Sequence, residues 1–314
     1  MGEGGDVATG GIAWPVKQRE LVQWVVDSRP WNDFAMRPDD VVITTWSKSG
    51  TTWMQQIVGQ LIFSGEPELY CEERSPWIEF RLRDDDLARA EAQTHRRYLK
   101  SHLPLDALVY APTAKYICVG RDIRDAYWSW HNHHMSFNEG VLAYLSSLYP
   151  DQPPYTYPNP DTRLAFFDWL ANDGYPNWSF WDYSQGWFDV RLLPNLKIVH
   201  FADLLADLPG QIRQIAAFLD IEIDPKTWPD VLEHCSFDYM RRLAISREGM
   251  RVIFKQGGAS FINKGTNGRW RDVLTAEDNA RVDAIVAEHL TPDCAHWLAT
   301  GQLPPADSAR NWTM

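Results

Sequence analysis

The residues with the clearest chemical potential form a short loop at positions 47–52, which reads SKSGTT. The β-branched run VVI precedes this loop and apolar residues at helical spacing follow it, so it is predicted to connect a buried strand to a helix. Backbone N–H groups at a helix N-terminus are unpaired and attract anions. Gly50 allows close backbone approach to a ligand, and Lys48 adds a positive charge. The hydroxyls of Thr51 and Thr52 complete the pattern of a phosphate-binding loop.

The loop differs from the Walker A pattern G-x-x-x-x-G-K-S/T of ATP-binding proteins. Thr45 stands at the first glycine position, and Lys48 precedes Gly50 instead of following it. ATP is therefore not the ligand that this loop predicts. Taken alone, the pattern also fits an ordinary strand–turn–helix connection with a solvated lysine.

A cation and a titratable ring lie two residues apart in the segment YLKSHLP at 98–104. Because side chains alternate between the two faces of an extended chain, Lys100 and His102 project from the same side. The sequence therefore predicts that an ammonium group and an imidazole share one cleft.

A second anion site is predicted in the segment KYICVGRDIRDAYWSW at 115–130. Residues 116–119 are typical of a strand, and Asp122 is placed to cap the helix that follows. Ser129 comes seven residues after Asp122, about two helical turns, so it faces back toward Arg121 at the end of the strand. An arginine and a hydroxyl then converge on a space that suits a phosphate.

In these segments the chain resembles the soluble, cytosolic-type sulfotransferases, which use 3′-phosphoadenylyl sulfate (PAPS) as the sulfuryl donor. Their loop S/T-Y-P-K-S-G-T-T-W is similar to TWSKSGTTW at 45–53, and their K-S/T-H-L-P matches residues 100–104. Their pattern R-N/D-x-x-D/E-x-x-x-S matches residues 121–129, and R-K-G-x-x-G-x-W is similar to NKGTNGRW at 263–270. Four motifs thus follow the family's order between residues 41 and 275.

The resemblance implies a set of contacts to the donor. The loop after residue 46 would hold the 5′-phosphosulfate, Arg121 and Ser129 the 3′-phosphate, and the segment at 235–237 the adenine. The residues implied to bind the donor are Lys48, Ser49, Gly50, Thr51, Thr52, Trp53, Arg121, Ser129, Phe201, Cys235, Ser236, Phe237, Asn263, Lys264 and Gly265.

Several positions depart from the family pattern. Trp46 and Ser47 replace the tyrosine and proline before the lysine, which leaves the loop less constrained than one that contains proline. Asn263 replaces an arginine and removes one charged contact to the 3′-phosphate. Phe201 and Cys235 replace a tyrosine and a threonine, so we expect a more apolar adenine pocket.

The reaction implied by the resemblance is sulfuryl transfer from PAPS to a hydroxyl or amine of a small aromatic or apolar acceptor, with adenosine 3′,5′-bisphosphate (PAP) as product. The implied catalytic residues are His102 as general base, with Lys48 and Lys100 stabilising the transferring group. A metal is not obligatory, because a sulfuryl group carries less charge than a terminal phosphoryl group. The alternatives are a P-loop-type kinase, which would need Mg²⁺ and Asp122 as a ligand, and a non-catalytic nucleotide-binding module.

Composition limits the partners. At 314 residues, without a repeat or a long linker, the chain is expected to form one domain over residues 1–314 with a flexible N-terminus over about 1–12. A formal net charge of −12 argues against nucleic acid or an anionic membrane as a partner. The chain has no signal-peptide pattern, and its four cysteines lack metal-site spacing, so we expect a cytoplasmic protein without bound zinc. The acidic run at 84–86 is expected to be a solvated turn.

The elements that must position these residues follow from hydrophobic periodicity. Strands are predicted at 41–43, 116–119 and 195–201, a helix at 208–219, and a last helix after Thr275, where a capping-box-like pattern begins. Alternation of strand and helix favours an α/β fold with a central parallel sheet flanked by helices, and the P-loop-like loop at its carboxyl edge.

The segment 144–187 is dense in aromatic residues and proline. It fits either core packing or an aromatic lid over the acceptor, and we expect the lid within about residues 136–187. His131, His133 and His134 are expected to flank the acceptor pocket and not to bind a metal, since no matching cysteine or carboxylate spacing accompanies them.

Overall fold

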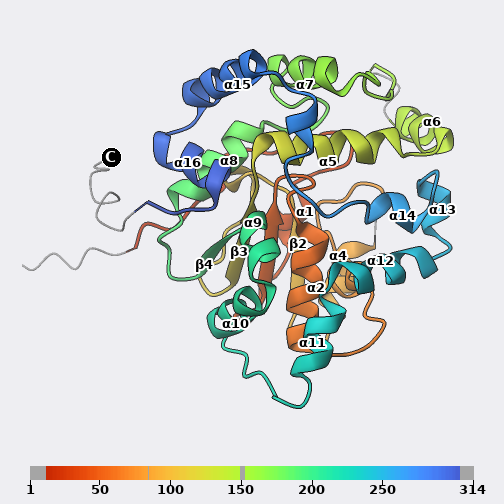
Figure 1. The fold of residues 1–314 in the computed structure, drawn as a ribbon. Coiled ribbons are helices and arrows are strands. Elements are labelled where there is room, and N and C mark those ends of the chain that lie inside the picture. Colours follow the sequence, from red (N-terminus) through yellow and green to blue (C-terminus); the bar gives the residue numbers. More distant parts are fainter. Residues whose placement is uncertain (1–11, 84, 149–152, 305–314) are drawn as a thin grey trace, which may run out of the picture.

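The computed structural model describes residues 12–83, 85–148 and 153–304, so the predicted flexible N-terminus lies almost entirely outside the described residues. A sheet forms the centre, with helices on both sides (Figure 1). Its strands are β1 (Val41–Thr45), β2 (Tyr98–Ser101), β3 (Lys115–Gly120) and β4 (Leu196–His200). The α-helices are α1 (Pro30–Asp33), α2 (Thr51–Ile62), α3 (Cys71–Arg74), α4 (Asp86–Glu91), α5 (Ile123–Met135), α6 (Glu139–Leu148), α7 (Thr162–Ala171), α8 (Phe180–Asp189), α9 (Phe201–Ala206), α10 (Leu208–Phe218), α11 (Trp228–His234), α12 (Phe237–Ser246), α13 (Met250–Ile253), α14 (Gly258–Phe261), α15 (Ala276–His289) and α16 (Pro292–Thr300). Two 3₁₀ turns are η1 (Leu105–Ala107) and η2 (Arg269–Asp272).

The four strands are all parallel, in the order β2-β1-β3-β4. Val42 of β1 lies opposite Leu99 of β2 and Tyr116 of β3, which fixes the register across the centre. Because parallel strands end at the same edge, the segments that follow the four strands meet there. The predicted parallel sheet is present, and β2 adds a strand at a segment predicted only to be extended.

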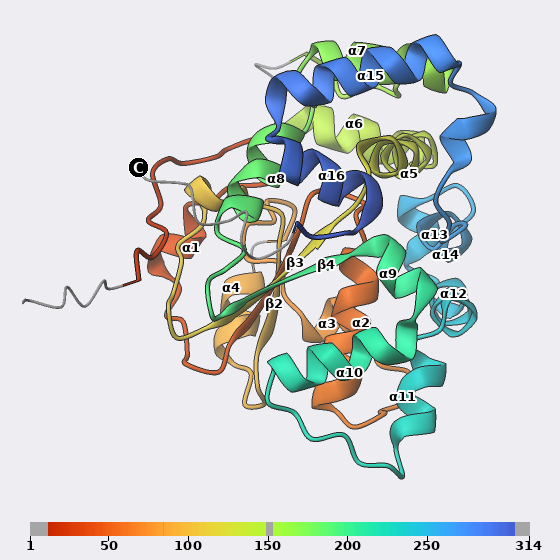
Figure 2. The ribbon, with the colours of Figure 1, turned by 60° about the vertical axis from the view of Figure 1, so that its left-hand side comes forward.

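The two faces of the sheet carry separate apolar cores, as the alternation of side chains along a strand requires. Val41, Ile43 and Ile117 pack against α2, α10 and α11. Val42 and Tyr116 point to the opposite face, where α8 and α16 contribute to the core. Figure 2 shows these two groups of helices on opposite sides of the strands. Helices therefore cover both faces, as predicted, and leave the carboxyl edge for a site.

Most aromatic side chains of the segment 144–187 belong to the core. Phe166 and Trp169 of α7, together with Tyr183 and Trp187 of α8, are buried in the core cluster on the α8 side of the sheet. For α7 and α8 the core interpretation is therefore the correct one. Residues 149–152, part of the proline-rich loop, lie outside the described residues.

The local helix signals in the sequence are largely confirmed. The Asp122 carboxylate caps α5 by accepting a hydrogen bond from the Arg124 backbone N–H at 2.8 Å. Thr275 and Asp278 form the complete capping box of α15. The prediction that this helix is the last one is wrong, because α16 follows it and packs against α8.

The acidic run at 84–86 differs from its prediction as a solvated turn. Asp86 is buried at the start of α4, and Asp84 lies outside the described residues. Arg89 and Arg83 lie 2.5 and 3.6 Å from the Asp86 carboxylate, and these cations compensate for its burial. Within the described ranges, no helix combines the length and apolar character that crossing a membrane requires.

Candidate active site

A cavity of about 1050 Å³ lies at the carboxyl edge of the sheet. Its walls combine the loop after β1, the residues that follow β2 and β3, the start of α9 and the segment 260–269, which are far apart in sequence. We call it the main cavity. The predicted site residues that line it are Lys48, Gly50, Thr51, Thr52, Trp53, Lys100, His102, Arg121, Ser129, Phe201, Phe237, Asn263, Lys264 and Gly265.

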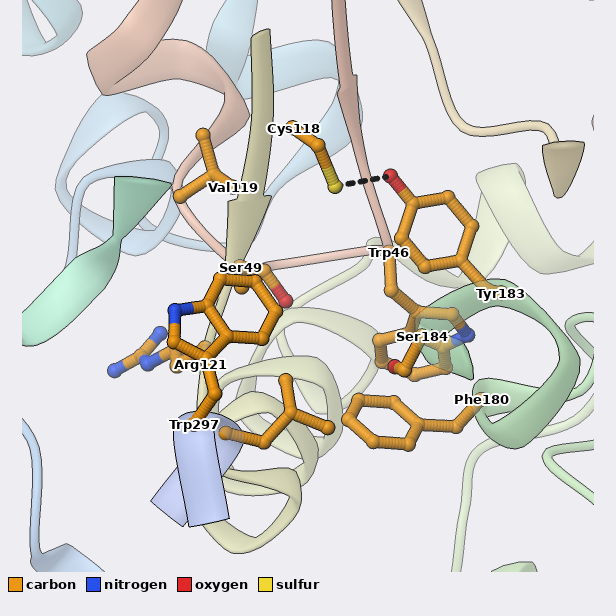
Figure 3. Close-up of a pocket in the computed structure, with 11 residues that line it drawn as sticks. Trp46, Ser49, Cys118, Val119, Arg121, Phe180, Tyr183, Ser184 and Trp297 are labelled. Carbon is orange, nitrogen blue, oxygen red and sulfur yellow. Dashed lines mark hydrogen bonds between the residues drawn. The ribbon is translucent and has the colours of Figure 1, made fainter. Parts of the chain in front are cut away.

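Three predicted donor-binding residues do not line the main cavity. Ser49 lines a separate internal cavity of about 10 Å³, room for about one water, together with Tyr183 (Figure 3). The Cys235 side chain is fully buried in the core beside α2. The Ser236 hydroxyl caps α12 by accepting a hydrogen bond from the Tyr239 N–H at 3.2 Å. Core packing thus occupies the Cys235 side chain and helix capping the Ser236 hydroxyl, two groups that the family resemblance implied to bind the donor.

The loop after β1 has the geometry of an anion site. Lys48 and Gly50 have φ values of 65° and 115°, so the chain turns sharply before α2 begins at Thr51. A Cβ at Gly50 would lie 2.9 Å from a carbon of Phe201, which explains why glycine is needed there. The N-cap, Gly50, provides no capping side chain. The first N–H groups of α2 are therefore available to a bound anion.

The His102 imidazole is buried, and hydrogen bonds of both its ring and its backbone hold the residue in place. Its Nδ1 lies 2.7 Å from the carbonyl oxygen of Thr45. Since a carbonyl can only accept, Nδ1 carries the proton and Nε2 of the neutral ring is left as an acceptor. The backbone N–H of His102 donates to the Glu79 carboxylate at 2.7 Å. Burial, followed by the charges of Lys100 and Lys48, keeps the pKa of His102 well below its usual value, so the ring is neutral at pH 7.

Two lysines with depressed basicity lie close to this ring. Burial is the main cause for both, and it lowers the pKa of Lys48 to about 7 and that of Lys100 to about 8. The charges of Lys100 and Arg121 lower the pKa of Lys48 further. The Lys48 ammonium lies 3.3 Å from Nδ1 of His133, and the Lys100 ammonium lies 3.8 Å from the centroid of the Trp77 ring. Like charges gathered in a buried space favour the binding of an anion between them.

Arg121 connects the loop after β1 to the segment 263–270. Its guanidinium donates to the Lys48 carbonyl at 2.9 Å, to the Thr266 carbonyl at 3.0 Å and to the Asn267 side chain at 3.0 Å. It also stacks over Phe201, 4.0 Å from the ring centroid. These three hydrogen bonds occupy three of its five N–H donors, and two remain for a ligand. Ser129 lines the same cavity, as the helical spacing predicts.

Aromatic rings form the wall that was predicted to face the adenine. Trp53 and Phe201 make an edge-to-face pair with centroids 5.5 Å apart, and Phe237 also lines the cavity. The Trp53 indole N–H donates to the Cys235 carbonyl at 2.8 Å. Position 235 therefore contributes through its backbone, which fixes the Trp53 ring.

Sequence reasoning missed Glu79 and Trp77, which support His102. The Glu79 carboxylate is buried, and it accepts hydrogen bonds from the His102 N–H and from the Trp31 indole N–H, each at 2.7 Å. Trp77 meets the imidazole edge-to-face with centroids 5.0 Å apart. An acidic residue within the apolar run PWIEF at 76–80 was the available signal for a buried, hydrogen-bonded carboxylate.

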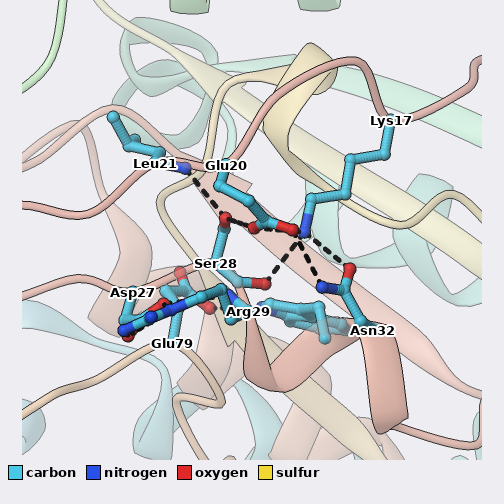
Figure 4. Close-up of polar contacts among 9 residues, drawn as sticks. Lys17, Glu20, Leu21, Asp27, Ser28, Arg29, Asn32 and Glu79 are labelled. Carbon is cyan, nitrogen blue, oxygen red and sulfur yellow. Dashed lines mark hydrogen bonds and ion pairs between the residues drawn. The ribbon is translucent and has the colours of Figure 1, made fainter.

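The N-terminal segment fixes the position of Trp31. Lys17 donates to the Ser28 carbonyl at 3.1 Å and to the Asn32 side chain at 2.7 Å, and the Ser28 hydroxyl donates to Glu20 (Figure 4). This polar network closes the turn that precedes α1, and Trp31 is a residue of α1. The segment before β1 therefore contributes to the placement of His102 through Glu79.

The histidine cluster after Ser129 divides between two environments. His133 and His134 line the main cavity, whereas His131 lies outside its lining and contacts the Asn159 carbonyl at 2.7 Å. In the part of the chain that the structure describes, no group of three or more His, Cys, Asp and Glu residues is placed to hold a metal ion. Asp122, the carboxylate that a kinase would need, caps α5 and does not line the main cavity.

Comparison with known proteins agrees with this geometry. The family model described as the sulfotransferase domain matches residues 38–292. A glycolipid sulfotransferase of Mycobacterium bovis is 30% identical over 88% of this chain and 93% of that protein. Human sulfotransferase 1C2 is 26% identical over 80% of this chain and 83% of that protein.

The fold is also found among solved structures. Mouse sulfotransferase SULT7A1 complexed with PAP is 18% identical, with a TM-score of 0.65 over 86% of this chain and 91% of that one. Retinol dehydratase in complex with androsterone and PAP is 20% identical, with a TM-score of 0.64 over 85% of this chain and 87% of that one. These likenesses confirm the α/β fold. The family match extends over all four motifs and leaves the kinase interpretation without support, and the chain therefore belongs to the sulfotransferase family, whose sulfuryl donor is PAPS.

Proposed function

We propose that this sulfotransferase moves a sulfuryl group from PAPS to a hydroxyl or amine of a small acceptor, with His102 as the general base. The observation that supports this most directly is the 2.7 Å contact between Nδ1 of His102 and the Thr45 carbonyl oxygen. It leaves Nε2 free to take the acceptor proton as the acceptor atom bonds to sulfur. The depressed pKa of His102 keeps the ring in the form that can accept a proton.

The residues of the main cavity suit a nucleotide with two separate anionic groups. One group fits the loop after β1, where Lys48 and the free N–H groups of α2 converge. The other fits the region of Arg121, Ser129 and Lys264, and the paired rings of Trp53 and Phe201 line the same cavity, with Phe201 under the Arg121 guanidinium. Such a spacing of charge and aromatic surface is what an adenosine with phosphates at both ends of its ribose requires.

We assign electrostatic roles to the two lysines. When bound, the donor supplies the sulfuryl group and departs as PAP. Lys48 is the cation placed in the anion loop, and it stabilises negative charge on the bridging oxygen. Lys100 is a residue of β2, two positions before His102, and the stacking of its ammonium on Trp77 fixes it where it can hold the sulfuryl oxygens.

The acceptor is inferred to bind in the apolar part of the main cavity. Rings from two regions line this part, including Trp77 and Phe80 on one side and Phe137, Tyr144 and Tyr155 on another. Trp77 and Phe80 stack with centroids 4.4 Å apart next to His102. We therefore propose that the lid expected within 136–187 is narrower and includes α6, Phe137 and Tyr155. An aromatic or apolar acceptor that carries a hydroxyl fits this lining.

The known relatives support a small-molecule acceptor. They include the glycolipid sulfotransferase of M. bovis and a 3-alpha-hydroxysteroid sulfotransferase of Cavia porcellus, which is 26% identical over 82% of this chain. We propose a cytoplasmic enzyme, because its four cysteines are buried free thiols, which suit a reducing compartment. The net charge of −12 disfavours nucleic acid and anionic membranes as partners.

Binding and transfer assays in EDTA test the proposed function. We expect PAP to bind at least about tenfold more tightly than ATP, because ATP cannot place a phosphate at both anion sites. With labelled PAPS and a panel of phenols, steroid alcohols, glycolipids and amines, we expect label on at least one acceptor without added metal. Tighter binding of ATP, or transfer that requires Mg²⁺, would contradict the assignment. Tight PAP binding without transfer to any acceptor would favour a binding module.

Proton uptake should accompany donor binding above neutral pH. Free Lys48 has a pKa of about 7, lowered mainly by burial, so at pH 8 most of it is neutral. A bound anion raises that pKa, so binding takes up a proton, and affinity falls as pH rises from 7 toward the pKa of the complex. Calorimetry of PAP at pH 8 in two buffers with different ionisation enthalpies measures this uptake. Lys48→Met should remove the larger share of the uptake, and Lys100, whose pKa burial lowers to about 8, should supply the remainder. Uptake equal to that of the wild type in this variant would assign the proton elsewhere.

A further inference from the structure

Arg269 lies at the second anion site without a partner for part of its guanidinium. It is the first residue of η2, which packs against α5, and it lines the main cavity with Arg121 and Lys264. Its Nε is buried and has no hydrogen-bond partner among the residues that the structure describes. A buried N–H of a charged group that lacks an acceptor is costly unless a ligand supplies one.

The charges around Arg269 leave the site positive. Arg121 and Arg269 are close enough for the charge of one to lower the pKa of the other. Asp125 is the carboxylate that raises the pKa of both, and it accepts a hydrogen bond from the Gly268 N–H at 2.6 Å. Asp122 also acts on Arg121, but its carboxylate is paired with Arg124. Three cations, Arg121, Arg269 and Lys264, therefore line the site, and Asp125 is the carboxylate that faces both arginines. An anion between the arginines would remove their repulsion.

The turn at Gly268 accounts for the placement of Arg269. Gly268 has a φ of 82°, and a Cβ there would lie 2.6 Å from the Arg271 guanidinium. Asp125 on α5 holds this turn through the Gly268 N–H, directly before η2. The same turn sends Arg271 to the exposed side, where it stacks on Trp270 with its guanidinium 5.0 Å from the ring. Two arginines of one loop therefore have opposite environments.

We propose that Arg269 binds the 3′-phosphate of the donor together with Arg121, and so replaces the charge that Asn263 lacks. Position 269 is an unspecified position of the pattern R-K-G-x-x-G-x-W, so the family motif does not assign this role. Arginine suits it because a guanidinium can offer two parallel N–H donors to a phosphate. The inference rests on the proposed function, since only a nucleotide with a 3′-phosphate would use the site.

Arg269→Gln tests the inference, with Arg271→Gln as the matched control in the same loop. We expect Arg269→Gln to weaken PAP at least about tenfold, the scale for losing a charged contact, and adenosine 5′-phosphate less than about twofold. Arg271→Gln should change either nucleotide less than about twofold, because its guanidinium is outside the cavity lining. Arg269→Lys keeps the charge, so its loss of PAP binding free energy should be less than half of the loss in Arg269→Gln. Calorimetric titration measures all four proteins, and thermal unfolding confirms that each is folded.

The outcomes separate this inference from the proposed function. If wild type binds PAP much more tightly than adenosine 5′-phosphate but Arg269→Gln behaves like Arg271→Gln, the role of Arg269 is wrong and the proposed function stands. If Arg269→Gln weakens both nucleotides equally, Arg269 does not contact the 3′-phosphate and the inference is overturned. If wild type does not distinguish the two nucleotides, the 3′-phosphate site itself, and the inference with it, fails.

Discussion

Replacement of His102 by alanine is expected to lower turnover at least ~100-fold, the usual scale for a positioned general base. The imidazole is buried beside Lys100, and its Nδ1–H is directed to the Thr45 carbonyl. Removing the ring removes the proton acceptor but leaves Lys48 and Arg121, which hold the anions. The dissociation constant of PAP should therefore change less than about threefold. Single-turnover rates with labelled PAPS and calorimetry with PAP measure the two effects separately.

Two further variants distinguish a base from a structural residue. His102→Asn keeps a side-chain N–H that can donate to the Thr45 carbonyl but has no ring nitrogen to accept a proton, so it should lose as much turnover as alanine. His131→Ala removes a histidine outside the cavity lining and should retain turnover within about threefold. Substantial activity in His102→Asn would show that the ring serves only to position its neighbours.

The pH dependence of the same reaction follows from the environment of His102. Burial, then Lys100 and Lys48, lower the pKa of the imidazole, and the active form of a base is the neutral one. Activity that depends on this ring is therefore lost only when pH falls below the lowered pKa, and the acidic limb of kcat/KM should lie below pH 6.5. Lys48 and Lys100 must be protonated, so their loss of charge determines the alkaline limb.

Most residues that the sequence assigned to the site line the main cavity, whereas the elements around it were predicted less completely. The cofactor loop, His102 and Arg121 each follow a strand directly, and parallel strands carry such residues to one edge. Apolar and β-branched runs identified β1, β3 and β4, because a buried parallel strand is rich in such residues. β2 was predicted only as extended, because the segment YLKSHLP is short and Pro104 closes it.

Contacts between distant segments explain what the sequence could not predict. An aromatic side chain has the same pattern in a core as in a lid, so only the packing of α7 against α5 shows that Phe166 and Trp169 are core residues. Glu79 became recognisable only through its partners Trp31 and His102, which lie 48 and 23 residues away. A motif match predicts which position lies near a ligand, but not the direction in which its side chain points. The Cys235 side chain points into the core, and the Ser236 hydroxyl caps α12.

The second large effect concerns Arg121, which is expected to distinguish nucleotides by their 3′-phosphate. Arg121→Ala should weaken PAP by roughly 2–4 kcal/mol, the scale for truncating one side of a buried charge pair. The loss has two sources: the guanidinium itself, and its hydrogen bonds to the Thr266 carbonyl and the Asn267 side chain, which order the segment that presents Lys264. Adenosine 5′-phosphate should weaken less than about threefold, because the hydrogen bond that Arg121 makes to the 5′ loop goes to the Lys48 carbonyl and not to the anion position.

A matched variant separates recognition of the phosphate from the general effect of losing a buried arginine. Arg124 is also buried near the start of α5, but it pairs with Asp122 and Asp283 and does not line the main cavity. Arg124→Ala should therefore affect both nucleotides equally and only slightly, whereas Arg121→Ala should affect PAP far more than adenosine 5′-phosphate. Equal losses for the two nucleotides in Arg121→Ala would mean that this guanidinium does not bind the 3′-phosphate. In that case Arg121 would only hold the segment 263–270 in place through its hydrogen bonds to Thr266 and Asn267. The positive charge that binds the 3′-phosphate would come from Arg269 and Lys264.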